Sequence, residues 1–415
     1  MKEPDLWPVK CSYDPIDMPI KFNHDGLSCF QFLRDECRYL PFLYQVPILR
    51  NCNVIYPTGL RIDWPTFIPA AAQSMHWKEA EETATALINE VTGLKSRAEG
   101  SLPSELEDFD SKASKRKELI DTTISASIHI FPAGNVQRAK LIAKANLIIA
   151  MHDGNITPFN YKLKFGIGFS MYLLSVMGSL IIQSYEMSAD SIIDVIESKF
   201  GLKKTIVDTP IFKRFAGEVI EEDPVVGPEL VKGITSWVKH TREKPPSSME
   251  FKSLSAYIDY RILDFAVDYC EAAIMFTCEI TRSRKELSRL TKIRKLVWTH
   301  LSLVNDLYSY EKEMCAERKK GDVVINAVRV LENLLAISSR EAKVILRGYI
   351  WNLEVEINEE YRQALYPYGS TGKEWRFVEG MMLAMAGNLF FSATCLRYAK
   401  PTLECVGSGV ADQRR

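Results

Sequence analysis

The sequence predicts an all-α protein, and three observations point to that fold class. Long stretches place apolar residues at the three- and four-residue spacing of a helix, and Pro or Gly residues separate these stretches. No stretch alternates apolar and polar residues in two runs joined by a hairpin turn. No segment recurs at a fixed period, which argues against a repeat protein. We therefore expect a helical bundle, in which sites are built from side chains that face the interior.

The expected elements follow in chain order. Residues 1–75 are rich in Pro and aromatic residues and are expected to form an irregular lead segment with short helices. A helix is predicted from Trp77 to Gly100, and residues 101–117 look like a polar loop. Further helical segments are predicted at 135–152, 161–185, 189–199, 248–281, 284–318, 322–335, 338–365 and 373–398. No helix is assigned between 199 and 248, where Gly217 to Pro228 is expected to be a break. We expect one helical domain over 76–400 and a tail over 401–415.

The composition excludes several classes of protein. Hydrophobic residues make up 47% of the 415 residues and charged residues 25%, which is an ordinary globular balance. The 52 basic and 53 acidic residues give a net charge of −1, so we expect no nucleic-acid partner. An anionic ligand would have to be captured by a few local charges and metal ions, because the chain has no overall positive field.

The cysteines and the apolar segments indicate the cellular compartment in which we expect the protein. The nine cysteines contain no CxxC pair and are irregularly spaced, which favours reduced, buried thiols in a cytoplasmic protein. The first residues contain no apolar run typical of a secretory signal. Residues 165–183 carry no charge over a length that could cross a membrane. Their many small residues and the absence of a second such span favour a buried core helix, so we expect no stable membrane insertion.

The most informative motif is the string Asn305-Asp-Leu-Tyr-Ser309-Tyr-Glu-Lys312-Glu313. Asn305, Ser309 and Glu313 are spaced i, i+4, i+8 and therefore lie on one face of a helix. Their amide, hydroxyl and carboxylate oxygens are the hard ligands that Mg²⁺ prefers. Lys312 lies beside them as a counter-charge for diphosphate. A solvated, charged helix with an incidental Asn is the alternative interpretation of this string taken alone.

This N-D-x-x-S-x-x-K-E string resembles the second metal-binding motif of class I terpene synthases, and its surroundings are most similar to fungal sesquiterpene cyclases. In that family an upstream Arg senses the diphosphate and an acidic linker residue follows it. Arg261 lies 44 residues before Asn305, and Asp264 follows Arg261 at i+3. The family also ends a late helix with an Arg-Tyr pair that binds diphosphate, which matches Arg397-Tyr398. The three matches span about residues 255–400.

The sequence departs from the family pattern in two places. The first metal motif of the family is D-D-x-x-D/E, and the matching place here retains only Asp153, with Gly154 and Thr157 where further acids would stand. The resemblance implies that Asp153 is a lone metal ligand, and an incidental Asp in a His-Asp-Gly turn is the alternative. The position after Asp264, commonly small in the family, is Phe265, which leaves open how the helix breaks there.

The chemistry implied by the resemblance needs few protein groups. Arg261, Lys312, Arg397 and Tyr398 would neutralise the departing diphosphate, together with metal ions. The hydrocarbon cation would need an apolar pocket that excludes water and offers aromatic faces. Trp298 and Leu301 precede Asn305 by seven and four residues, so they share its helix face. Weaker candidates for the pocket are Phe265, Phe276, Asn388 and Phe391, and core packing is the alternative interpretation for the aromatic residues other than Trp298.

The resemblance implies an α-helical bundle with a central active-site cavity and a Mg²⁺-dependent sesquiterpene cyclase with three ions. The implied substrate is farnesyl diphosphate, and a humulene-type macrocycle is the implied product because some divergent relatives with a degraded first motif make it. A diterpene cyclase that uses geranylgeranyl diphosphate and a non-catalytic helical binding protein derived from a cyclase are the alternatives. A chain-elongating prenyltransferase would need two intact Asp-rich motifs, which the sequence lacks. The sequence leaves open whether the protein forms a homodimer.

Overall fold

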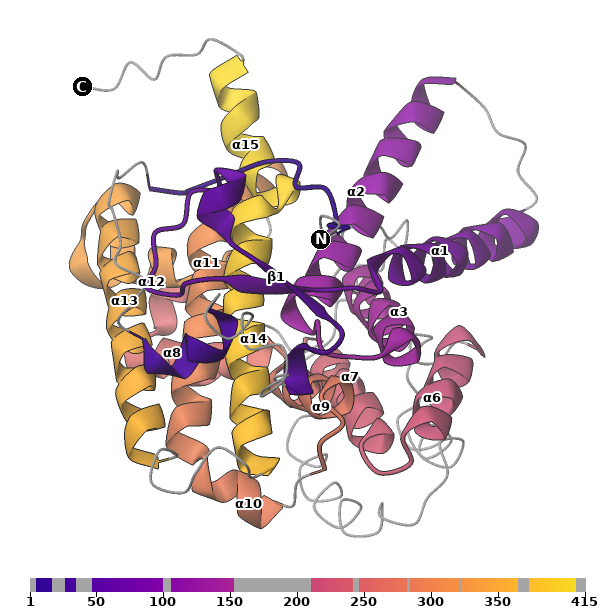
Figure 1. Cartoon of the computed structure of the whole chain (residues 1–415). Helices are drawn as coiled ribbons and strands as arrows, with labels where there is room; N and C mark the ends of the chain where they lie inside the picture. The colour runs from indigo at the N-terminus through magenta and orange to yellow at the C-terminus, as the bar shows by residue number, and fades with distance from the viewer. Residues whose placement is uncertain are drawn as a thin grey trace, which may run out of the picture.

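The computed structural model describes residues 5–16, 27–34, 47–99, 106–152, 210–241, 246–281, 284–320, 323–364 and 373–407. Within these residues the protein is an α-helical bundle with one small sheet, which confirms the all-α prediction (Figure 1).

The helices of the described residues are α1 (Trp77–Glu99), α2 (Leu106–Ile130), α3 (Val136–His152), α6 (Pro210–Glu222), α7 (Gly227–His240), α8 (Leu254–Asp264), α9 (Val267–Thr277), α10 (Arg284–Arg289), α11 (Thr291–Lys320), α12 (Ala327–Leu335), α13 (Ser339–Ala364), α14 (Lys373–Thr394) and α15 (Leu396–Gly407).

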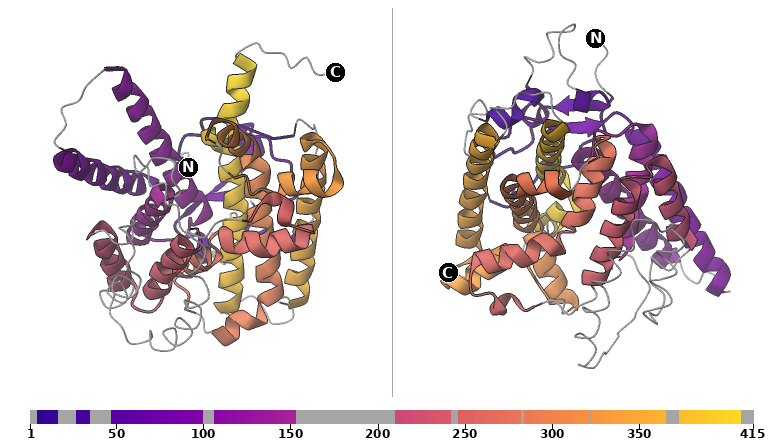
Figure 2. Two further views of the ribbon diagram at one scale, coloured as in Figure 1. Left: turned by 180° about the vertical axis from the view of Figure 1, so that it is seen from behind. Right: turned by 90° about the horizontal axis from the view of Figure 1, so that it is seen from below.

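Helix α14 is the central element of the bundle. It packs against α11 on one side and α2 on the other, and α13 covers the far side of α11 (Figures 1 and 2). Residues 377–393 are all buried. An added Cβ at Gly387 would lie 1.8 Å from the carbonyl oxygen of His129, so α14 and α2 touch backbone to backbone there. The apolar sequence of α14 is therefore the sequence of a helix surrounded by protein.

The same helix bears on the membrane question. In the described part of the chain, one stretch, Trp375–Pro401, is long and apolar enough to cross a membrane by length and composition. Of its apolar window, 94% is buried against the rest of the protein, as in a core helix. The stretch at 165–183 that drew attention in the sequence lies outside the described residues, as do the helices predicted at 161–185 and 189–199.

Two helical regions were missed by the sequence analysis. The polar loop predicted at 101–117 is wrong from Leu106 onward, because α2 begins there. Its Glu, Lys and Ala residues are good helix formers even where no apolar periodicity marks them. The region between 199 and 248 holds α6 and α7, and Pro210 and Pro228 lie in their first turns. Proline at that position starts a helix instead of breaking one.

The lead segment contains short helices, as expected, and also a small sheet that was not predicted. It contains short 3₁₀ helices at Ser28–Leu33, Pro47–Leu49 and Pro57–Leu60, and a two-stranded antiparallel sheet. Strands β1 (Cys52–Ile55) and β2 (Ala71–Ser74) pair with Cys52 opposite Ser74. The hairpin pattern is absent from the sequence because residues 56–70, in place of a tight turn, separate the two strands. All four β2 residues are buried against α14 and α2.

Hydrogen bonds tie the lead segment to the bundle. The backbone N–H of Tyr13 donates to the Ala393 carbonyl over 2.8 Å. The Thr66 hydroxyl and the Phe67 N–H donate to the buried carboxylate of Glu354 on α13. The segment therefore packs across the side of α13 and α14 (Figure 1).

Candidate active site

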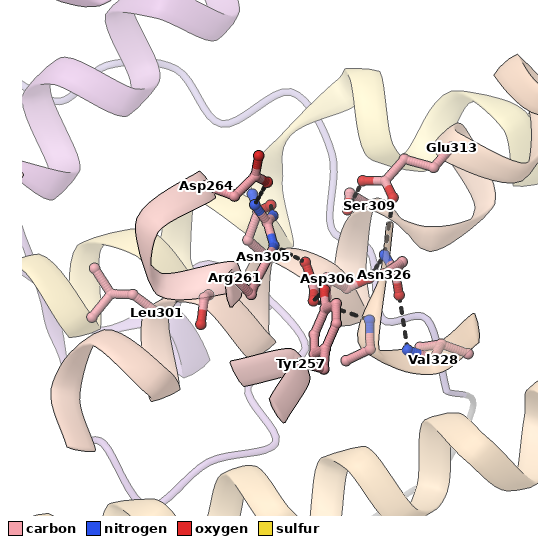
Figure 3. Close-up of polar contacts among 12 residues, drawn as sticks. Tyr257, Arg261, Asp264, Leu301, Asn305, Asp306, Ser309, Glu313, Asn326 and Val328 are labelled. Atoms are coloured by element: carbon pink, nitrogen blue, oxygen red, sulfur yellow. Dashed lines mark hydrogen bonds and ion pairs between the residues drawn. The ribbon is translucent and has the colours of Figure 1, made fainter. Parts of the chain in front are cut away.

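The three predicted metal ligands share one face of α11. The Ser309 hydroxyl donates to Oε1 of Glu313 over 2.5 Å. Nδ2 of Asn326, the N-cap residue of α12, donates to Oε2 of Glu313 over 3.1 Å (Figure 3). Asn305 lies one turn before Ser309 on the same helix. These three oxygen donors thus lie along α11, with the Glu313 carboxylate held in place by two hydrogen bonds.

The amide of Asn305 has a defined orientation. Its Oδ1 accepts a hydrogen bond from Nη2 of Arg261 over 2.9 Å. Its Nδ2 donates to the Tyr398 hydroxyl over 2.8 Å. The structure therefore brings together residues of α8, α11 and α15 that the sequence analysis connected only by their spacing. Figure 3 shows Arg261 of α8 beside Asn305 of α11.

Arg261 is the centre of a buried ion-pair network. Its Nε donates to Asp306 Oδ1 over 2.8 Å, and its Nη1 donates to Asp264 Oδ2 over 2.6 Å. The side chain is only 9% exposed. Burial acts to lower the pKa of Arg261, but Asp306 and the other nearby acids outweigh burial and hold this pKa above its ordinary value. The guanidinium is therefore a permanent cation at the edge of the metal face.

Asp306 and Tyr257 were not predicted as site residues. Asp306 is fully buried, and its carboxylate accepts hydrogen bonds from the Tyr257 hydroxyl, from Arg261 and from the Ala327 N–H. Burial raises the pKa of Asp306, and Arg261 and the Tyr257 hydroxyl oppose that shift. The available signal was spacing, because Tyr257 precedes Arg261 by one helical turn and Asp306 lies inside the metal motif.

The helix predicted over 248–281 breaks directly after Asp264. Phe265 caps α8, and Ala266 takes a left-handed conformation with φ 62° before α9 begins. Such a backbone is costly for a residue other than glycine and needs surrounding support. Nε1 of Trp237 on α7 supplies a contact, donating to the Asp264 carbonyl over 2.9 Å. Phe265 does not prevent the break, and its ring lies 5.7 Å from the Arg261 guanidinium carbon.

The Arg-Tyr pair opens α15. Tyr398 is buried, and burial raises the pKa of its hydroxyl, which therefore stays protonated. Because this oxygen accepts from Asn305, its own hydrogen is left for another acceptor. The Lys312 Nζ lies 5.9 Å from the Tyr398 ring centroid. Nη2 of Arg397 is buried and has no hydrogen-bond partner within the described residues, as expected of a donor built for a bound anion.

Three candidates for the apolar pocket, Trp298, Leu301 and Asn388, take part in hydrogen bonds with neighbouring helices. Trp298 is buried, and its Nε1 donates to Glu271 Oε1 over 2.8 Å. Nδ2 of Asn388 donates to the Leu301 carbonyl over 3.0 Å, which joins α14 to α11. The polar groups of Trp298 and Asn388 thus form hydrogen bonds between helices. The roles of Trp298, Leu301 and Asn388 toward substrate stay predictions.

The other two aromatic candidates, Phe391 and Phe276, have different neighbours. The Phe391 ring packs edge-on against Tyr398, with centroids 5.8 Å apart, and so belongs with the Arg-Tyr pair. The Phe276 ring lies 4.7 Å from the Arg138 guanidinium carbon, near the end of α9. A role of Phe276 toward substrate stays a prediction.

Asp153 and Thr157 lie outside the described residues, so the first-motif assignment stays a prediction from sequence. Helix α3 ends at His152, the residue before Asp153. Within the described residues no group of three or more His, Cys, Asp or Glu side chains could hold a metal ion. A metal held by the described residues alone would therefore have to use amide and hydroxyl oxygens as well as carboxylates.

The residues present fit a hard divalent cation beside an anion. Asn305, Ser309 and Glu313 offer oxygen ligands of three kinds on one helix face, a set that Mg²⁺ accepts together with water and phosphate oxygens. Burial raises the pKa of Glu313, while Lys312 and the Ser309 hydroxyl favour its ionised form. The unpartnered Arg397 Nη2 supplies an independent sign of an anionic ligand.

Comparison with known proteins agrees with this geometry. Residues 212–355 match the family model for terpene synthase family 2, C-terminal metal binding. The matched range includes α8 with Arg261 and α11 with Asn305, Ser309 and Glu313.

Three known proteins illustrate the similarity. Terpene cyclase 6 of Gibberella fujikuroi is 28% identical over 347 residues, covering 83% of this chain and 85% of that protein. Terpene cyclase aneC of Aspergillus aculeatus is 25% identical over 405 residues, covering 97% and 82%. The crystal structure of aristolochene synthase from Penicillium roqueforti superposes with a TM-score of 0.50 at 16% identity, covering 74% of this chain and 94% of that one.

Proposed function

We propose that this chain, a class I terpene synthase by its C-terminal metal-binding domain and its fold, cyclises farnesyl diphosphate to a cyclic sesquiterpene hydrocarbon. The convergence of Arg261, Asn305 and Tyr398, from three helices, is the observation that carries the proposal. It puts a buried cation and a hydroxyl group within hydrogen-bond distance of the same amide, that of Asn305. That combination suits a diphosphate leaving group.

The protein groups act mainly on the leaving group. In ionisation the bond between C1 and the diphosphate oxygen breaks, and diphosphate departs with the electron pair. Arg261, Lys312, Arg397 and the Tyr398 hydroxyl hold the negative charge that develops on that oxygen. Mg²⁺, for which we propose three ions, would neutralise further charge when bound. Asn305, Ser309 and Glu313 would hold Mg²⁺ from α11, and we propose Asp153 as a ligand from the opposite side.

The hydrocarbon cation requires an environment that excludes water. Trp298 and Leu301 are buried on the α11 face that also carries Asn305, and Phe391 packs beside Tyr398. Aromatic faces stabilise a cation without acting as nucleophiles. Loss of a proton then gives a neutral hydrocarbon, for which we propose a humulene-type macrocycle. A cytoplasmic location, expected from the cysteine pattern, is part of this proposal.

Incubation of the purified protein with farnesyl or geranylgeranyl diphosphate, with Mg²⁺ or EDTA, tests the proposal by mass spectrometry of the hydrocarbon extract. We expect a cyclic C15 hydrocarbon from farnesyl diphosphate only when Mg²⁺ is present. A C20 hydrocarbon made in its place would identify a diterpene cyclase. Absence of any hydrocarbon from both substrates, from protein that binds Mg²⁺ and diphosphate, would identify a non-catalytic binding protein.

A further inference from the structure

One face of α7 contacts the break between α8 and α9. Gly233, Trp237 and His240 are spaced i, i+4, i+7, so they lie on the same face of that helix. An added Cβ at Gly233 would lie 2.6 Å from the Tyr269 Cα, so only glycine allows this approach to α9 (Figure 1). One turn later Trp237 donates to the Asp264 carbonyl. The face therefore holds the backbone on both sides of the break.

The same face also reaches the end of α3. The Trp237 ring packs edge-on against His152, with ring centroids 5.4 Å apart. Nε2 of His152 lies 3.0 Å from the Thr241 hydroxyl, which directly follows α7. Helix α7 thus links the Asp264 region to the end of the helix that precedes Asp153. Helix α7 therefore supports both the Asp264 region and the end of α3, and its contacts set the distance between them.

His240, on the same face of α7, lies near the Asp264 carboxylate without a hydrogen bond to it. Its Nε2 lies 3.8 Å from Asp264 Oδ1, which is too far for a hydrogen bond. This nitrogen is buried and has no hydrogen-bond partner within the described residues. The other carboxylate oxygen of Asp264, Oδ2, is the one that accepts from Arg261. The imidazole packs against the Tyr260 ring, with centroids 5.6 Å apart, which limits where Nε2 can point.

We propose that His240 is a positioning residue whose Nε2–H donates a hydrogen bond to Asp264 when Arg261 turns to the diphosphate. This inference rests on the proposed function. Nη1 of Arg261 donates to Asp264 and Nη2 donates to Asn305, and each of these nitrogens carries one further N–H. Turning the guanidinium to point these N–H groups at a diphosphate moves Nη1 away from Asp264. When the Arg261 guanidinium moves away, the Asp264 carboxylate loses a hydrogen-bond donor and needs another. A small rotation of Asp264 brings its Oδ1 within hydrogen-bond distance of the His240 Nε2–H. The new bond lowers the free energy required to release Arg261.

Titration calorimetry of inorganic diphosphate with MgCl₂ tests this role. We compare the wild type with His240→Phe, which keeps a ring without a donor, and His240→Gln, whose amide nitrogen reaches the place of Nε2. His240→Phe should weaken diphosphate binding about 10-fold, the value of one hydrogen bond to a charged group. His240→Gln should stay within about 3-fold of the wild type. Without ligand, all three should melt at similar temperatures, because Nε2 of His240 has no hydrogen-bond partner among the described residues in that state.

The coupling between His240 and Asp264 provides the second measurement. In an Asp264→Ala background, His240→Phe should cause no further loss of diphosphate affinity. The inference is overturned if His240→Phe binds diphosphate like the wild type, if Gln fails to restore binding, or if the loss persists in the Asp264→Ala background. His240→Leu replaces His240→Phe should the larger ring prevent folding. A wild type that does not bind diphosphate with Mg²⁺ would instead refute the proposed function, and the inference with it.

Discussion

Asn305 and Tyr398, which are 93 residues apart in the chain, are joined by a hydrogen bond of 2.8 Å in which the Asn305 amide nitrogen donates to the Tyr398 hydroxyl. The direction of this bond matters for metal binding. Because Nδ2 is held by Tyr398, Oδ1 is turned toward Arg261 and the metal face of α11. Tyr398 therefore orients the amide that we propose as a metal ligand, and its hydroxyl hydrogen can donate to the proposed diphosphate.

Removal of this orienting bond should weaken metal binding. Tyr398→Phe leaves the Asn305 amide free to rotate, so we expect about 10-fold more Mg²⁺ to be needed for half-maximal activity. The matched control is Tyr308→Phe on α11, whose buried hydroxyl has no hydrogen-bond partner within the described residues. Magnesium titrations of diphosphate release check both variants. An unchanged magnesium requirement in Tyr398→Phe would show that Asn305 needs no such support.

The Asp306 carboxylate should be essential for folding as well as for activity. Asp306→Asn removes the fully buried anion that pairs with Arg261 and leaves that guanidinium under-compensated. We expect a loss of about 3–5 kcal/mol in the free energy of unfolding, measured by urea denaturation. Asp264→Asn is the comparison, because the Asp264 side chain is 25% exposed, and it should lose far less stability. Equal losses in the two variants would contradict the central structural role of Asp306.

Arg261 and Trp298 should fail in different ways. Arg261→Ala should suppress diphosphate release by at least about 100-fold from every prenyl diphosphate, because the leaving group loses a fixed cation. Trp298→Leu should keep diphosphate release measurable but change the hydrocarbon mixture. Trp298→Phe retains an aromatic face and loses only the donor to Glu271, so its mixture should lie closer to that of the wild type. A changed mixture from Arg261→Ala and an unchanged one from Trp298→Leu would reverse these roles.

The sequence predicted the helices that carry the chemistry better than those that support them. The spacing of Asn305, Ser309 and Glu313 required only that α11 be a helix, and the contact between Asn305 and Tyr398 supports the pairing of distant motifs. Pattern reasoning found α11, α13 and α14 because their buried faces are long and periodic. It missed α7 because Gly227 and Pro228 resemble a break, although they form its first turn.

The remaining features depend on tertiary contacts that no local pattern encodes. Asp306 looks like a spacer within the motif until α8 supplies Tyr257 and Arg261 as its donors. The left-handed Ala266 is a conformation that its own sequence disfavours, and it persists where α7 holds the neighbouring Asp264 carbonyl. Both features follow from the meeting of helices far apart in the chain.

Glu379 at the start of α14 should make stability fall as the pH rises. Burial raises the pKa of this carboxyl to about 7, although the Trp375 N–H bonded to it favours the ion. The folded chain therefore holds this proton more tightly than the unfolded chain. The free energy of unfolding should fall from about pH 4.5 to about pH 7 and stay reduced above that.

The variant Glu379→Gln keeps the acceptor for Trp375 and stays neutral. It should resemble the wild type at pH 5 and exceed its unfolding free energy by roughly 3 kcal/mol at pH 8.5. Urea denaturation at the two pH values measures the difference, with the exposed Glu356→Gln as control. A gain that is the same at both pH values would show that the proton on Glu379 is not responsible.

The central claim is that the oxygen ligands on α11 bind metal for ionisation of a prenyl diphosphate. Simultaneous measurement of diphosphate release and hydrocarbon formation from farnesyl diphosphate, over a range of Mg²⁺, tests it most directly in the wild type and in Asn305→Ala/Glu313→Ala. We expect the wild type to release one diphosphate for each hydrocarbon, and the double variant to lose both products by at least about 1,000-fold while circular dichroism shows it folded. Near-normal release of diphosphate by a well-folded double variant would contradict the account.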